Sequence, residues 1–98
     1  MRMHNPPHPG RIIKDALEAI PMNVTAFAAH IGVSRVALSR VLNQKAGVTP
    51  EMSIKISEAF GQSAPDIWFN LQNDYDFWQV SKARSRRERV EPLQSKAA

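Results

Sequence analysis

Apolar residues recur at helical spacing in five stretches of the chain, and a break follows each of the first four. The first stretch contains Ile12, Ile13, Ala16, Leu17 and Ile20, and the last contains Ile67, Trp68, Leu71, Tyr75 and Trp78. Spacings of three and four residues place such positions on one face of an α-helix. No stretch shows sustained alternation of apolar and polar residues bounded by hairpin turns. The pattern therefore predicts an all-α fold of five helices.

Residues that commonly begin or end helices stand at the boundaries of these stretches. Pro9 suits the first turn of the first helix, where its missing N–H would have no partner, and Pro21 ends that helix. Capping side chains precede the other helices: Asn23 before 24–31, Ser34 before 35 to about 43, Thr49 with Pro50 before the fourth, and Ser63 with Asp66 before the fifth. These signals predict one domain over residues 9–80, between an arm of residues 1–8 and a tail of residues 81–98.

The second and third helices have the spacing of a helix-turn-helix. Residues 24–43 read VTAFAAHIGVSRVALSRVLN, with the small Ala28 where the helices approach each other and Gly32 in the turn. The residues predicted to face inward are Phe27, Ile31, Val33, Leu38 and Val41. In such a pair the second helix is left able to enter the major groove of DNA. The motif therefore predicts double-stranded DNA as a partner.

The charge of the chain is unevenly distributed. The net charge is +4, yet residues 1–81 hold seven basic and seven acidic side chains. The excess lies in the tail, where Lys82, Arg84, Arg86, Arg87, Arg89 and Lys96 face only Glu88 and Glu91. We expect this tail to be disordered and solvated, because it is charged and lacks apolar periodicity. Bulk charge is therefore a weak argument for nucleic acid.

The local charge around the predicted helix-turn-helix is more informative. No carboxylate lies between Glu18 and Glu51, whereas Arg35, Arg40 and Lys45 recur every five residues. The candidate DNA-binding residues are Thr25, Ser34, Arg35, Val36, Ser39, Arg40, Asn43 and Lys45. Either arginine can donate two hydrogen bonds to guanine, and Val36 can pack on a thymine methyl. The other side chains suit phosphates. The sequence does not decide which arginine reads a base, and Arg40 is the first we would test.

The last helix carries more apolar surface than a small bundle needs. Its aromatic stripe predicts core or interface packing, and we expect a homodimer through Trp68, Leu71, Tyr75 and Trp78. Trp78→Ala is then expected to weaken self-association. A two-fold dimer would place its two recognition helices about 34 Å apart, or a multiple of one duplex turn, on a palindromic operator.

Several other classes of function find no support. Cysteine is absent, which excludes disulfides and thiolate metal sites. No apolar run is long enough to span a membrane, so we expect a cytoplasmic protein without membrane partners. His4 and His8 lack a third nearby ligand, and neither a metal nor another cofactor is expected. The sequence has no Gly-rich phosphate loop and no nucleophile with a matched base, so we do not expect an enzyme.

The chain resembles lambda-repressor-like, or XRE, helix-turn-helix proteins, through Ala28, Gly32, Val33 and Ser34. The segments NPPHPGRIIKDAL, LSRVLNQKAGVTPEMSIKISEAFG and IWFNLQNDYDFW narrow the resemblance to HigA-type antitoxins over about residues 5–80, with Phe77 in place of a more typical leucine. This resemblance implies a dimer that represses its own operon and neutralises a HigB-type mRNA endoribonuclease toxin. Two alternatives stay open: a regulator without a toxin partner, and a protein-interaction module whose DNA binding is incidental.

Overall fold

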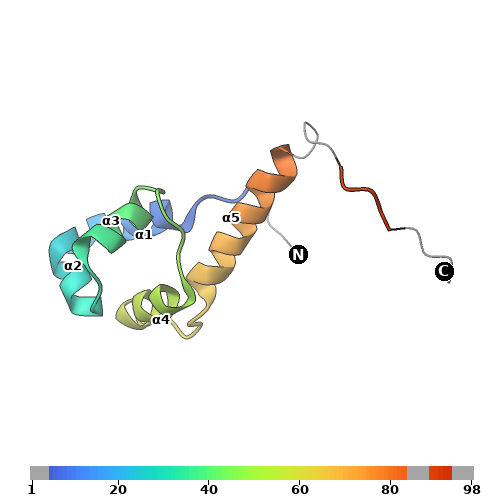
Figure 1. Cartoon of the computed structure of the whole chain (residues 1–98). Helices are drawn as coiled ribbons and strands as arrows, with labels where there is room; N and C mark the ends of the chain where they lie inside the picture. The colour runs from blue at the N-terminus through green and yellow to red at the C-terminus, as the bar shows by residue number, and fades with distance from the viewer. Residues whose placement is uncertain (1–4, 84–88, 94–98) are drawn as a thin grey trace.

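The computed structural model describes residues 5–83 and 89–93, and these residues form five helices without strands (Figure 1). The helices are α1 (Pro9–Glu18), α2 (Val24–Ile31), α3 (Arg35–Leu42), α4 (Pro50–Ala59) and α5 (Ile67–Ala83). The predicted all-α, five-helix fold is confirmed. Residues 1–4 of the arm and residues 84–88 and 94–98 of the tail lie outside the described part. None of the described helices has the length and apolar character needed to cross a membrane.

Local capping interactions set the beginnings of α2, α3 and α4, as the sequence predicts. The side chains of Asn23, Ser34 and Thr49 accept hydrogen bonds from backbone N–H groups three residues ahead, at 2.8, 3.0 and 3.2 Å. Each of these bonds satisfies a donor that has no partner inside the helix. Gly32 ends α2 with a φ of 79°, a left-handed conformation that costs glycine little.

The start of α5 differs from the prediction. The helix begins at Ile67, so Ser63 is too far from its first turn to cap it, and the predicted capping box with Asp66 does not form. A buried serine of α4 holds this start instead. The Ser53 hydroxyl donates to the Pro65 carbonyl at 2.8 Å and accepts from the Phe69 N–H at 3.1 Å. A tertiary contact therefore fixes the start of α5, in place of the local capping box that the sequence predicts. At its other end α5 continues to Ala83, three residues past the predicted domain boundary.

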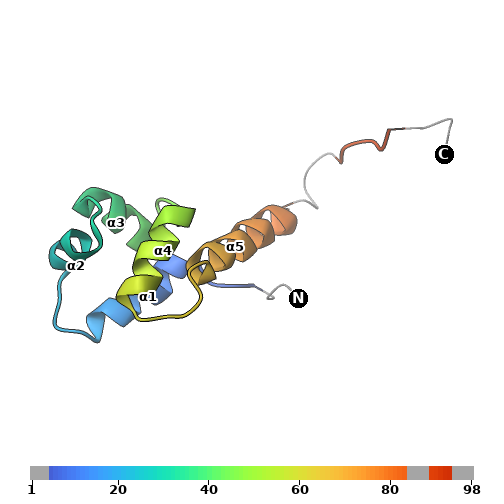
Figure 2. The ribbon, with the colours of Figure 1, turned by 90° about the horizontal axis from the view of Figure 1, so that it is seen from below.

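The apolar faces of the helices meet in one core. Ile13 of α1, Leu38 of α3 and Ile56 of α4 have no exposed surface. Around them lie Leu17, Phe27, Ala28, Ile31, Val41, Leu42, Val48, Met52 and Trp68. Helices α1 to α4 make up the body of the domain, and α5 packs on it at one end and projects beyond it (Figures 1 and 2).

The first turn of α1 is packed tightly between the arm, α3 and α5. His8 is only 5% exposed and caps α1, because its Nδ1 accepts from the Gly10 N–H at 2.9 Å. Its ring stands edge-on to Tyr75 of α5, with 4.9 Å between ring centroids. A Cβ atom at Gly10 would overlap the carbonyl oxygen of Val41, so glycine is required where α1 meets α3. His8 therefore has a structural role, and its Nδ1 lone pair is occupied.

Burial lowers the pKa of His8 below 6.5, although the nearby Asp76 carboxylate and a hydrogen bond with the Ala46 backbone oppose this shift. The unfolded chain therefore binds a proton in a pH range where the folded chain does not. The contribution of His8 to the free energy of unfolding is therefore greatest above about pH 6.5. It declines as the pH falls from this value toward the lowered pKa of the folded state.

We expect His8→Asn to remove this component of the pH dependence, because asparagine also caps helices but does not titrate. The measurement is the free energy of unfolding in urea for both proteins between pH 5 and 8. The difference between wild type and variant should shift against the wild type as the pH falls. A difference in the free energy of unfolding that stays constant across the range would show that folding does not lower the pKa of His8.

Candidate nucleic-acid interface

Helix α3 presents two sides of opposite character. Leu38, Val41 and Leu42 are at most 3% exposed and face the core. The other side carries the predicted DNA-binding residues Arg35, Val36, Ser39, Arg40 and Asn43, of which all except the half-buried Ser39 are exposed. We call these five residues the outer face of α3. Val36 is 65% exposed, although it is apolar, so it lies where a base-edge methyl could contact it.

The short polar side chains of this region already have local partners. The Asn43 amide donates to the carbonyl oxygen of Ser39 at 3.0 Å and to the Ser39 hydroxyl at 3.2 Å. Ser34 accepts from Ala37 as the N-cap, and its hydroxyl proton can still be donated. Thr25 is exposed in the first turn of α2, where backbone N–H groups favour anions. These residues suit phosphate contacts.

The two arginines occupy different environments. Arg35 is the first residue of α3, the end from which recognition helices contact bases. Arg40 lies in the last turn, and its Nη2 donates to the carbonyl oxygen of Lys45 at 3.2 Å. The contact ties Arg40 to the loop that follows α3. It favours Arg35 as the base-reading residue, which sequence alone could not decide.

The nearest acidic residue after the motif is directed toward a lysine. Glu51 Oε2 lies 3.5 Å from Lys55 Nζ, one turn along α4. Lys55 Nζ also donates to the Gly32 carbonyl oxygen at 3.4 Å, which joins α4 to the turn between α2 and α3. No carboxylate occurs between Glu18 and Glu51 in the sequence. The outer face of α3 thus carries two exposed cations and no carboxylate of its own, as binding to a polyanion requires.

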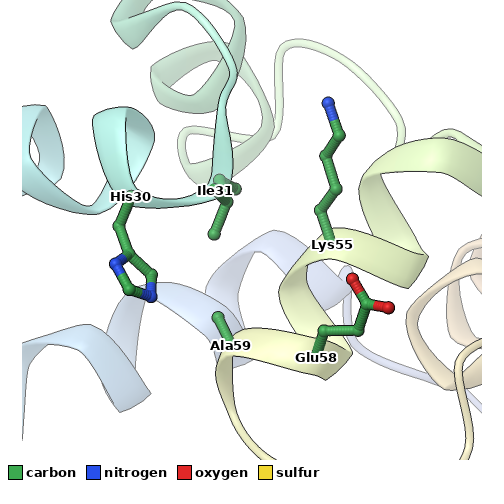
Figure 3. A pocket seen from close by; sticks show the side chains of 5 residues that line it. All are labelled: His30, Ile31, Lys55, Glu58 and Ala59. Carbon is green, nitrogen blue, oxygen red and sulfur yellow. The ribbon is translucent and has the colours of Figure 1, made fainter.

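A cleft between α2 and α4 lies apart from the outer face of α3 (Figure 3). It encloses about 250 Å³ and is lined by His30, Ile31, Lys55, Glu58 and Ala59. His30 and Glu58 are both exposed, and Lys55 makes the contacts described above. Nothing in the cleft pairs a nucleophile with a base. The described residues contain no group of three side chains suited to hold a metal ion.

The structure places the α5 residues that the sequence predicts at a dimer interface in different environments. Trp68 is 5% exposed and belongs to the core, where its Nε1 donates to Gln62 Oε1 at 2.9 Å. Both its packing and its hydrogen bond are therefore made within one chain. Leu71 packs against the core and Tyr75 against His8, while Trp78 is half-buried. The exposed large apolar residues of α5 are instead Phe77 and Val80, at 52% and 55%.

The fold and this exposed, basic helix face define a DNA-binding helix-turn-helix protein. Residues 13–67 match the helix-turn-helix family, and the chain belongs to this XRE-like family. Virulence-associated protein A' of Dichelobacter nodosus is 43% identical over 91% of this chain and 77% of its own length.

Solved structures extend the likeness to antitoxins. A putative antidote protein of a plasmid maintenance system from Nostoc punctiforme is 31% identical, with a TM-score of 0.78 over 85% of this chain and 90% of that one. The Pseudomonas aeruginosa antitoxin HigA, solved with the higBA promoter, is 26% identical, with a TM-score of 0.77 over 91% and 99%. The structural neighbours of this chain therefore include HigA-family antitoxins.

We expect Arg35→Ala to weaken binding to a duplex of specific sequence about 5- to 150-fold more than binding to a random duplex, since a bidentate contact to guanine discriminates between bases. Arg40→Ala should weaken both by similar factors. Fluorescence anisotropy titrations at one fixed salt concentration provide the measurement. Equal losses for Arg35→Ala on both duplexes would exclude base readout by Arg35, and a selective loss for Arg40→Ala would assign it to that residue.

Proposed function

We propose that this protein is the antitoxin of a toxin–antitoxin pair, which binds operator DNA through the outer face of α3 and represses its own operon. The observation that carries the proposal is the exposed, acid-free face of Arg35, Val36 and Arg40 on a fold shared with HigA bound to promoter DNA. The toxin it neutralises would be a HigB-type mRNA endoribonuclease encoded beside it. This part of the proposal is supported by the similarity to antitoxin HigA, which was solved with the higBA promoter.

The DNA-binding form of the protein would be a homodimer. Half-sites of a palindrome require two recognition helices related by a two-fold axis. We propose that α5 supplies the contact, because it projects beyond the body of the domain (Figure 1). It also exposes the apolar side chains of Phe77 and Val80. Trp78, the residue after Phe77, is half-buried and adjoins this contact in the chain.

Expression of the adjacent reading frame alone should arrest growth, and co-expression with this protein should restore growth and yield a stoichiometric complex. The protein should also bind DNA upstream of its gene with an affinity that falls steeply with salt, as neutralised phosphates require. Operator binding beside a harmless neighbour would instead indicate a regulator without a toxin. A stable complex without salt-dependent duplex binding would indicate an interaction module.

Phe77→Asp should convert a dimer into a monomer, because a carboxylate buried against a second protomer is strongly unfavourable. Phe77→Leu is the matched control and should preserve the dimer. Light scattering coupled to size exclusion at low micromolar concentration measures the change. If the Asp variant has the dimeric mass, α5 does not form the contact through Phe77.

A further inference from the structure

A buried glutamine of α5 holds the loop that follows the recognition helix. Gln72 is 5% exposed, and its Oε1 accepts from the backbone N–H of Val48 at 3.0 Å. Its Nε2 donates to Asp76 Oδ1 at 2.9 Å. The amide is therefore oriented by a partner on each side, with its oxygen directed at the loop. Burying an amide is costly unless it is hydrogen-bonded in this way.

The loop between Leu42 and Pro50 carries Lys45, the predicted phosphate anchor. Near α3 the loop is held by local bonds, since Lys45 N–H donates to the Arg40 carbonyl at 2.7 Å and Arg40 Nη2 returns to the Lys45 carbonyl at 3.2 Å. Near α4 it is held by α5 through the Gln72–Val48 bond. Gly47, which lies between the two attachments, packs so closely that a Cβ atom there would stand 3.2 Å from Gln72 Cδ.

We propose that Gln72 is a positioning residue for DNA binding, which sets the loop so that Lys45 meets a phosphate. The inference rests on the proposed function, because it assumes that the outer face of α3 and Lys45 contact DNA. Gln72 would act through the loop and not by a contact of its own with nucleic acid, because its side chain is buried. It lies on α5, the helix proposed to join two protomers, so the same helix connects the dimer to the DNA-contacting loop.

The physical reason is the ordering of the loop. A phosphate contact from a mobile lysine requires the backbone of the loop to be ordered on binding, which reduces affinity. With Val48 hydrogen-bonded to Gln72, the loop is ordered before DNA arrives. Gln72→Met keeps a side chain of similar volume against Gly47 but removes both hydrogen bonds. Asp76 is exposed and can bind water in place of the amide.

The test first follows the loop without DNA. In Gln72→Met, amide hydrogen exchange at Val48 should accelerate by about tenfold or more, while the amides of Leu38 and Ile56 in the core keep their protection. Asn73→Ala is the control, because Asn73 is the exposed neighbour on α5 and should leave exchange at Val48 unchanged. Unchanged exchange at Val48 in Gln72→Met would overturn the positioning role.

The test then asks whether Gln72 acts through Lys45. Gln72→Met and Lys45→Ala should each weaken duplex binding by about 3- to 10-fold and reduce the salt slope by about one. The double variant should bind no more weakly than Lys45→Ala alone. Additive losses, or an unchanged salt slope in Gln72→Met, would show a merely structural effect and overturn the inference. A wild-type protein that binds no duplex would instead refute the proposed function.

Discussion

A helix of eight residues cannot be stable by itself in water, and this constraint governs the recognition helix α3. Its stability comes from burying Leu38, Val41 and Leu42 on the inner side of the helix, where Ala37 also packs against the core. The inner side is therefore reserved for the core. The outer side makes no comparable contribution to folding and can hold exposed cations and the 65% exposed Val36. Separation of these two roles allows so small a helix to be both held firmly and available to DNA.

Contacts distant from the outer face hold the motif in position. Lys55 of α4 donates to the turn between α2 and α3, Ser53 fixes the start of α5, and Gln72 of α5 holds the loop after α3. Because this scaffold already orders the motif, little conformational entropy remains to be lost when its cations bind DNA. Because residues 1–81 have no net charge, the attraction of this part of the chain to DNA must be local, and salt screens charges beyond about 8 Å under physiological conditions.

The parts of the fold that sequence predicted are those set by local interactions. Asn23, Ser34, Thr49 and Gly32 act within a few residues of their own positions, so their roles follow from spacing alone. The missed features depend on tertiary packing. Ser53 and Gln72 are polar residues buried by partners 12 and 24 positions away, which no periodicity indicates. Trp68 lies on an apolar face, as predicted, but periodicity cannot distinguish burial against the same chain from burial against a second one. Likewise, the bond from Arg40 to Lys45, on which we base the proposal that Arg35 reads a base, appears only in the structure.

DNA is proposed to meet the outer face of α3 and the loop that carries Lys45. A titration of isotope-labelled protein with operator duplex, followed by amide chemical shifts, tests it most directly. The largest changes should fall on residues 34–45 and on the first turn of α2, with small changes around the cleft of His30 and Glu58. Changes concentrated in that cleft or along α4, with residues 34–45 unaffected, would contradict it.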